Sequence, residues 1–157
     1  LALERTRPWM IQLLVVCGHN HHLVRRLQRL TSTSSMPLHV FGFVQTMDEL
    51  MAASDVMVTK GGGLTVMEAL AMGLPMIFCG TIPGQEWLNA QYIASSGAGV
   101  IGKGVSDVVA AVLRLLDDAE RLNAMQTCAR ALSKPGAARE LVERLVVPLA
   151  RASSRLS

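Results

Sequence analysis

Three consecutive glycines, Gly61, Gly62 and Gly63, separate an apolar run from a helix-forming run. Glycine lets the backbone approach a ligand closely and adopt positive φ, and a helix start offers unpaired N–H groups with partial positive charge. This combination is typical of an anion site, and a diphosphate is the usual ligand. The stretch matches neither the P-loop nor the GxGxxG fingerprint. A tight turn that only permits close packing is therefore the alternative interpretation.

A single acid, Glu68, lies in the apolar helical stretch that follows these glycines. It follows Thr65 by three residues, so both side chains project from one helical face, about a turn beyond the anion site. An unpaired buried carboxylate is costly, whereas at this place it can accept hydrogen bonds from both hydroxyls of a ribose attached to the diphosphate. The alternative is that Glu68 reaches solvent or pairs with a cation, for which Lys60 is the obvious candidate.

A second polar cluster follows the next apolar run. Pro83–Gly84 predicts a turn, and the first turn of the helix after it carries Gln85, Glu86 and Asn89. An amide followed by an acid suits the neighbouring hydroxyls of a hexose. The alternative is that Gln85 and Glu86 only complement the helix dipole.

Composition narrows the class of protein. Half of the 157 residues are apolar and 17% are charged, which excludes intrinsic disorder. The net charge of +3 gathers in arginines near the start that are not interleaved with aromatic residues, so no nucleic-acid surface is predicted. An anionic ligand or an acidic membrane surface fits this charge equally well.

Three scattered cysteines cannot all pair, which favours a reduced, cytoplasmic setting. The histidine-rich stretch 18–22 lacks the spacing of a zinc enzyme, and no metal site is predicted.

The elements that must position these residues can be read from the alternation of apolar runs and helical patterns. This alternation predicts right-handed β-α-β crossovers and an α/β fold, a parallel sheet with helices on both faces. Asn20 and Thr46 are the expected helix N-caps, the latter with Glu49 in a capping box. Ligands bind outside the carboxyl ends of such strands, so the loops after the first four strands should open onto one crevice. The expected strands are 10–17, 38–41, 55–59, 75–79 and 98–101, and the expected helices are 21–30, 47–54, 64–72, 85–95, 106–116, 119–131 and 137–147.

Several stretches in this order resemble the C-terminal half of the MurG-like glycosyltransferases. Within that group the chain is most similar to the diacylglycerol glycosyltransferases, including monogalactosyldiacylglycerol synthases and processive diacylglycerol glucosyltransferases. The resemblance covers residues 10–132 and rests on VVCGHN, FGFVQTMDELMAASD, VTKGGGLTVMEALAMGLPMIF and IPGQEWLNAQYI. It implies the GT-B architecture, in which two Rossmann-like domains face each other across a cleft. It also implies that the C-terminal domain binds a UDP-sugar, and that a hexose moves with inversion and without a metal or other cofactor.

The resemblance assigns roles around the nucleotide. Phe43 and Val44 match the positions that hold uracil, Val44 through its backbone. Glu68 matches the acid that holds the ribose hydroxyls. The diphosphate-binding loop matches Gly62, Gly63, Leu64 and Thr65.

For the sugar, Gln85 and Glu86 match the pair that reads the hexose, with Asn89 as a helper. Two positions depart from the family pattern. Many relatives have Pro where Gly61 stands, which should make this loop looser. His19 stands where Arg or Lys is frequent, and a neutral imidazole there would weaken phosphate attraction near pH 7.

The resemblance also implies what lies elsewhere in the protein. Residues 1–150 correspond to the donor domain and 151–157 to a frayed tail. The first strand with its loop, the acceptor domain for a diacylglycerol-type lipid and the catalytic base belong to a part that this chain does not include. We therefore expect the chain alone to bind a UDP-sugar weakly and to transfer nothing, and the full protein to be cytoplasmic with peripheral membrane contact.

Other functions stay open. An epimerase or hydrolase half of the same architecture would bind the same donor, and a non-catalytic nucleotide-sugar-binding module would bind it without chemistry. In relatives the last helix, 137–150, crosses to the other domain. Alone, its apolar stripe of Leu141, Leu145 and Leu149 should pack on this domain or touch a membrane.

Overall fold

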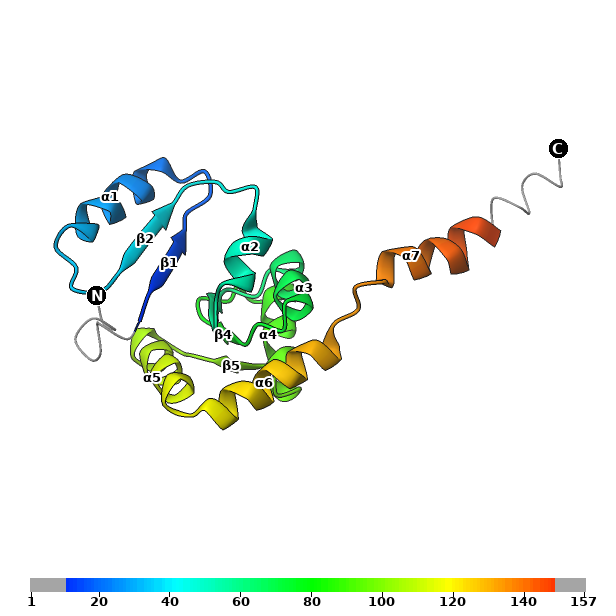
Figure 1. Ribbon diagram of the computed structural model, residues 1–157. Helices are drawn as coiled ribbons and strands as arrows, with labels where there is room; N and C mark the ends of the chain where they lie inside the picture. The colour runs from blue at the N-terminus through cyan, green and yellow to red at the C-terminus, as the bar shows by residue number, and fades with distance from the viewer. Residues whose placement is uncertain (1–10, 149–157) are drawn as a thin grey trace.

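The computed structural model describes residues 11–148, in which strands and helices alternate as the sequence predicts (Figure 1). The predictions for residues 1–10 and 149–157, including those for Leu149 and for the first residue of the first predicted strand, lie outside this range. The elements are β1 (Leu13–Val16), α1 (His21–Thr31), β2 (Leu38–Phe41), α2 (Met47–Ala52), β3 (Met57–Thr59), α3 (Gly63–Ala71), β4 (Met76–Phe78), α4 (Gln85–Ser95), β5 (Gly99–Ile101), α5 (Val105–Asp117), α6 (Ala119–Leu132), α7 (Ala137–Leu141) and the π-helix η3 (Val142–Val146).

All strand pairs are parallel, as predicted, but the ladder is interrupted between β1 and β3. One sheet has the order β1-β2 and the other the order β3-β4-β5, and within residues 11–148 no strand pair joins them. In both sheets the strands are joined by helical crossovers, as in doubly wound α/β folds. In the part of the chain that the structure describes, β1 and β3 therefore each end a sheet and have a backbone edge without a strand partner.

The core gathers around β4, which has a strand on each side. All three of its residues are fully buried, and alternate side chains of a strand point to opposite faces. Met76 and Phe78 pack in one apolar cluster with residues of α3, α4 and α6. Ile77 packs in a second cluster with residues of α5 and α6. Helices therefore cover both faces at β4.

The predicted helix caps have different outcomes. Asn20 caps α1, because its side-chain Oδ1 accepts a hydrogen bond from the Leu23 amide at 3.0 Å. Thr46 is the N-cap of α2, but its side chain makes no cap hydrogen bond. The capping box with Glu49 is therefore wrong.

The segment after α6 does not return to the sheets. α7 and η3 extend away from the rest of the chain (Figure 1), and Leu141 and Leu145 remain 59% and 57% exposed. The expectation that this stripe packs on the domain is wrong for these two residues. The predicted helix over 137–147 is present, and its residues Val142–Val146 form a π-helical segment. Within residues 11–148, no helix combines the length and the apolar character needed to cross a membrane.

Gly99 in β5 offers a test of this core. A Cβ there would lie 2.8 Å from Cε2 of Phe78 and 3.0 Å from the carbonyl oxygen of Met76, both of them parts of fully buried residues. We expect Gly99→Ala to lower the free energy of unfolding by about 1–3 kcal/mol because the core has to shift, measured by urea denaturation. Gly136→Ala is the matched control, since a Cβ there meets nothing within 4 Å. Equal stability of the two variants would contradict this packing.

Candidate functional site

The glycine loop is held against the start of α4. Gly61 is buried, with φ +95°, and a Cβ on it would lie 2.8 Å from the carbonyl oxygen of Glu86. The Asn89 side-chain amide donates a hydrogen bond to the Gly61 carbonyl oxygen at 3.0 Å. The loop is thus fixed at Gly61 rather than loosened there, and a proline could not adopt this φ.

The next two glycines start α3 and leave its first turn accessible. Gly62 is the N-cap, with no side-chain cap hydrogen bond, and Gly63 is the first helical residue. The first amides of a helix have no partner within the helix. A Cβ at Gly62 would meet nothing within 4 Å, and Leu64 is 83% exposed. Thr65 is half-buried. This helix end therefore lies at the protein surface, where its first amides can face an anion.

The first turn of α4 brings its polar residues beside the start of α3. A Cβ built on Gly63 would lie 3.9 Å from both Gln85 Nε2 and Asn89 Nδ2. The structure thus brings together three residues that the sequence placed in two separate stretches. Hydrogen-bonding groups of α4 stand next to the amides of α3, which suits a ligand with an anionic and a hydroxyl-rich part.

Glu86 is engaged on both carboxylate oxygens. Oε1 lies 2.9 Å from Lys60 Nζ in an ion pair, and Oε2 accepts a hydrogen bond from the Ile82 amide at 3.3 Å. The hydrogen bond from Lys60, and secondarily the one from the Ile82 amide, hold the pKa of Glu86 below its usual value although partial burial opposes them. The proposed pairing of Lys60 with Glu68 is therefore wrong, because Lys60 binds a different acid.

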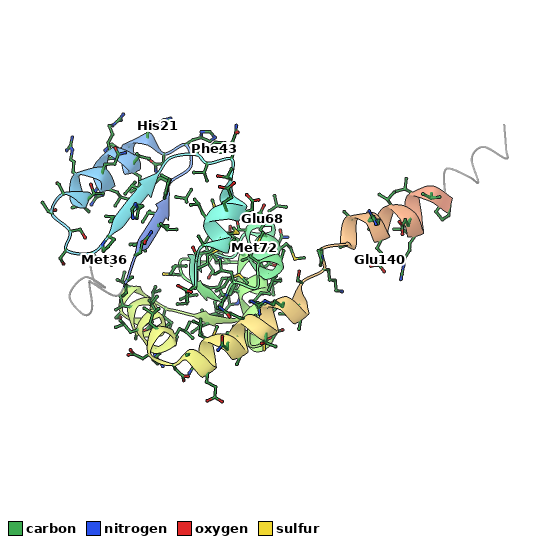
Figure 2. The ribbon with its side chains drawn as sticks, in the orientation of Figure 1. His21, Met36, Phe43, Glu68, Met72 and Glu140 are labelled. Atoms are coloured by element: carbon green, nitrogen blue, oxygen red, sulfur yellow. The ribbon has the colours of Figure 1, made fainter. Side chains whose placement is uncertain are left out.

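Glu68 lies on α3 beside Met72 and is exposed (Figure 2). It borders a shallow groove of about 230 Å³, lined by Met67, Glu68, Ala71, Ser133, Lys134 and Pro135. The other wall of the groove thus comes from the link between α6 and α7. The carboxylate is open to a ligand in this groove.

The loops after β1 and β2 carry an aromatic pair. The rings of His19 and Phe43 are stacked, with centroids 4.6 Å apart and planes at 10°, and Phe43 is 61% exposed (Figure 2). The two loops lie close together, because a Cβ on Gly42 would lie 3.7 Å from the Gly18 carbonyl oxygen. Val44, the other residue matched to uracil, is half-buried. Sequence reasoning missed this stack; the signal was an aromatic side chain just after each of two neighbouring strands.

The predicted site residues therefore form two groups. One comprises the loops after β1 and β2, and the other the loops after β3 and β4; within residues 11–148 no hydrogen bond, ion pair or ring contact joins these loops. A further hollow of about 210 Å³, lined by Thr81, Pro83, Gly84 and Trp87, adjoins the second group and was not predicted. No cluster of potential metal ligands occurs among the described residues.

Comparison with known proteins gives this geometry a context. Residues 1–141 match the family of glycosyltransferase family 28 C-terminal domains. The processive diacylglycerol β-glucosyltransferase of Bacillus pumilus is 35% identical over 136 residues, which make up 87% of this chain and 36% of that protein. The enzyme of the same name from Bacillus mycoides is 37% identical over 136 residues, 87% of this chain and 35% of that protein. The chain thus spans about a third of the length of these relatives.

Solved structures show the same fold. Acinetobacter baumannii MurG superposes with a TM-score of 0.72 at 20% identity, covering 90% of this chain and 43% of that chain. The Streptomyces glycosyltransferase SsfS6, complexed with thymidine diphosphate, superposes with a TM-score of 0.53 at 21% identity, covering 85% of this chain and 41% of that chain. The predicted α/β fold of a GT-B C-terminal half is confirmed.

Adjacent glycines in the loop should tolerate a side chain very differently. Gly61→Ala places a Cβ at positive φ and against the Glu86 carbonyl, so we expect it to lower the free energy of unfolding by about 2 kcal/mol or more. Gly62→Ala enters open space at a φ of −59° and should cost about 1 kcal/mol or less as a weaker N-cap. Thermal unfolding of both variants measures the difference, and a reversed order would contradict the loop geometry.

Proposed function

The chain belongs to the family of glycosyltransferase family 28 C-terminal domains, and from this premise we propose that it binds the donor of an inverting glycosyltransferase. The enzyme moves a hexose from a UDP-sugar to a diacylglycerol-type lipid. The observation that carries the proposal is the glycine loop with its open amides, fixed beside the polar first turn of α4. The names of the two Bacillus relatives support the lipid acceptor, and the thymidine diphosphate in SsfS6 supports a nucleoside diphosphate in the donor.

The proposed role of the loop is to stabilise the leaving group. Backbone amides of the α3 start, with the helix dipole behind them, take up the charge that develops on the departing diphosphate. This requires no metal and no other cofactor, because fixed N–H groups supply the positive potential. The residues with this role are Gly62, Gly63, Leu64 and Thr65.

The nucleoside lies along the remaining residues of the two groups. The exposed ring of Phe43, backed by His19, offers a flat apolar surface for uracil, and Val44 offers its backbone. The open carboxylate of Glu68 accepts hydrogen bonds from the ribose hydroxyls. Gln85, Glu86 and Asn89 at the start of α4 read the hexose, with Asn89 also holding the loop.

Other parts of the protein complete the enzyme in this proposal. They supply a parallel strand between β1 and β3, the acceptor domain and the general base, which must lie within hydrogen-bond reach of the acceptor hydroxyl. Residues 1–150 form the donor domain. The full protein is cytoplasmic and meets the membrane peripherally, where its lipid acceptor resides.

Nucleotide binding is the direct test. We expect calorimetric titration of the 157-residue chain with UDP to show weak binding, and incubation with a UDP-hexose and diacylglycerol to give no glycolipid. Absence of heat at millimolar UDP, from a sample with a cooperative unfolding transition, would contradict the proposed function. Release of free hexose from the UDP-hexose would instead favour a hydrolase.

Substitutions at two residues should separate nucleotide binding from sugar recognition. We expect Glu68→Ala to weaken UDP binding about tenfold, because two hydrogen bonds to a charged acceptor are lost. We expect Gln85→Ala to change the preference between UDP-glucose and UDP-galactose and to leave UDP affinity within about twofold. Glu120→Ala, an exposed acid on α6, is the matched control. Unchanged affinity and preference in both variants would show that the site is misassigned.

A further inference from the structure

Lys60 lies between the end of β3 and the glycine loop. It follows the last residue of β3 and precedes Gly61, and its Nζ lies 2.9 Å from Glu86 Oε1. The Lys60 side chain is 60% exposed, whereas that of Glu86 is only 20% exposed. The pair thus joins the end of β3 to the first turn of α4, with the acid on the protected side.

Glu86 is held at a fixed position by three segments of the chain. Its own helix carries it, Lys60 binds Oε1, and the Ile82 amide in the loop after β4 donates to Oε2. Each carboxylate oxygen has two lone-pair sites, so one site on each oxygen stays available for a ligand. An exposed surface ion pair usually contributes little to stability. Stability alone therefore does not explain why Lys60 and the Ile82 amide both hold the Glu86 carboxylate.

The first turn of α4, which carries Glu86, lies close to the glycine loop. The Glu86 backbone carbonyl is 2.8 Å from where a Gly61 Cβ would be, and Gln85 Nε2 is 3.9 Å from the corresponding point at Gly63. An ionised acid beside a diphosphate site repels the ligand unless a cation offsets it. Lys60 is the cation that contacts this acid.

We propose that Lys60 is a positioning residue of the donor site. Its positive charge reduces the repulsion between Glu86 and the diphosphate, and its ion pair orients the free lone pairs of the Glu86 carboxylate toward the hexose hydroxyls. The inference rests on the proposed function and deepens it. Lys60 acts through Glu86, so removing both charges restores what removing Lys60 alone takes away. A residue that contacts the diphosphate directly does not show this recovery.

Calorimetry with UDP and with UDP-hexoses on variants of the 157-residue chain tests the proposal. We expect Lys60→Met to weaken UDP binding about tenfold, because the Glu86 charge is then unopposed. Lys60→Arg should stay within about threefold of the unaltered chain. The double variant Lys60→Met/Glu86→Gln should regain UDP affinity but lose the additional affinity for the UDP-hexose. Lys103→Met, an exposed lysine before α5, should match the unaltered chain.

Two results would overturn the inference. One is a Lys60→Met variant that binds UDP as Lys103→Met does, and the other is a double variant as weak as Lys60→Met.

A readout without nucleotide separates this inference from the proposed function. The Lys60 hydrogen bond is the main cause that lowers the pKa of Glu86, so Lys60→Met should raise that pKa toward its usual value in a carboxyl NMR titration. An unchanged Glu86 pKa overturns the role of Lys60 even where the unaltered chain binds UDP. Failure of the unaltered chain to bind UDP, with the pKa change present, overturns the donor site itself and the role of Lys60 in it.

Discussion

The contact between the glycine loop and the first turn of α4 is the constraint on which the candidate site depends. Gly61 can lie against the Glu86 carbonyl only because it has no side chain and can adopt positive φ. The Asn89 amide then fixes the carbonyl of the loop, and Lys60 reaches Glu86 from the residue before it. Two loops that follow neighbouring strands are thus held together, with the start of α3 on one side and the polar side chains of α4 on the other.

Much of the site was predictable because its signals are local in the sequence. Glycines before a helix-forming run predict the open helix start, and the structure places Gly62 and Gly63 there. The longer-range pairings were not predictable. Lys60 is eight residues from Glu68 but pairs with Glu86, because the parallel pairing of β3 and β4 brings the start of α4 to the glycine loop.

The fold was predictable for a similar reason. Its prediction failed where pairing between distant segments decides the outcome. Alternating apolar runs predict parallel strands, and the structure has parallel hydrogen-bonded pairs of β1 with β2 and of β4 with β3 and β5. The predicted sheet assumed buried strands, yet all four residues of β1 are half-buried and Val58 in β3 is 49% exposed. These strands are less buried because each has an edge without a partner strand among residues 11–148. The apolar pattern of a segment predicts that it forms a strand, but it does not predict which strands pair with it.

The link between α6 and α7 has a second role that its position creates. Ser133, Lys134 and Pro135 connect the body to the projecting helix, and the same residues form the wall of the groove opposite Glu68. The projecting helix is therefore joined to the rest of the domain by the same few residues that border the space around the Glu68 carboxylate.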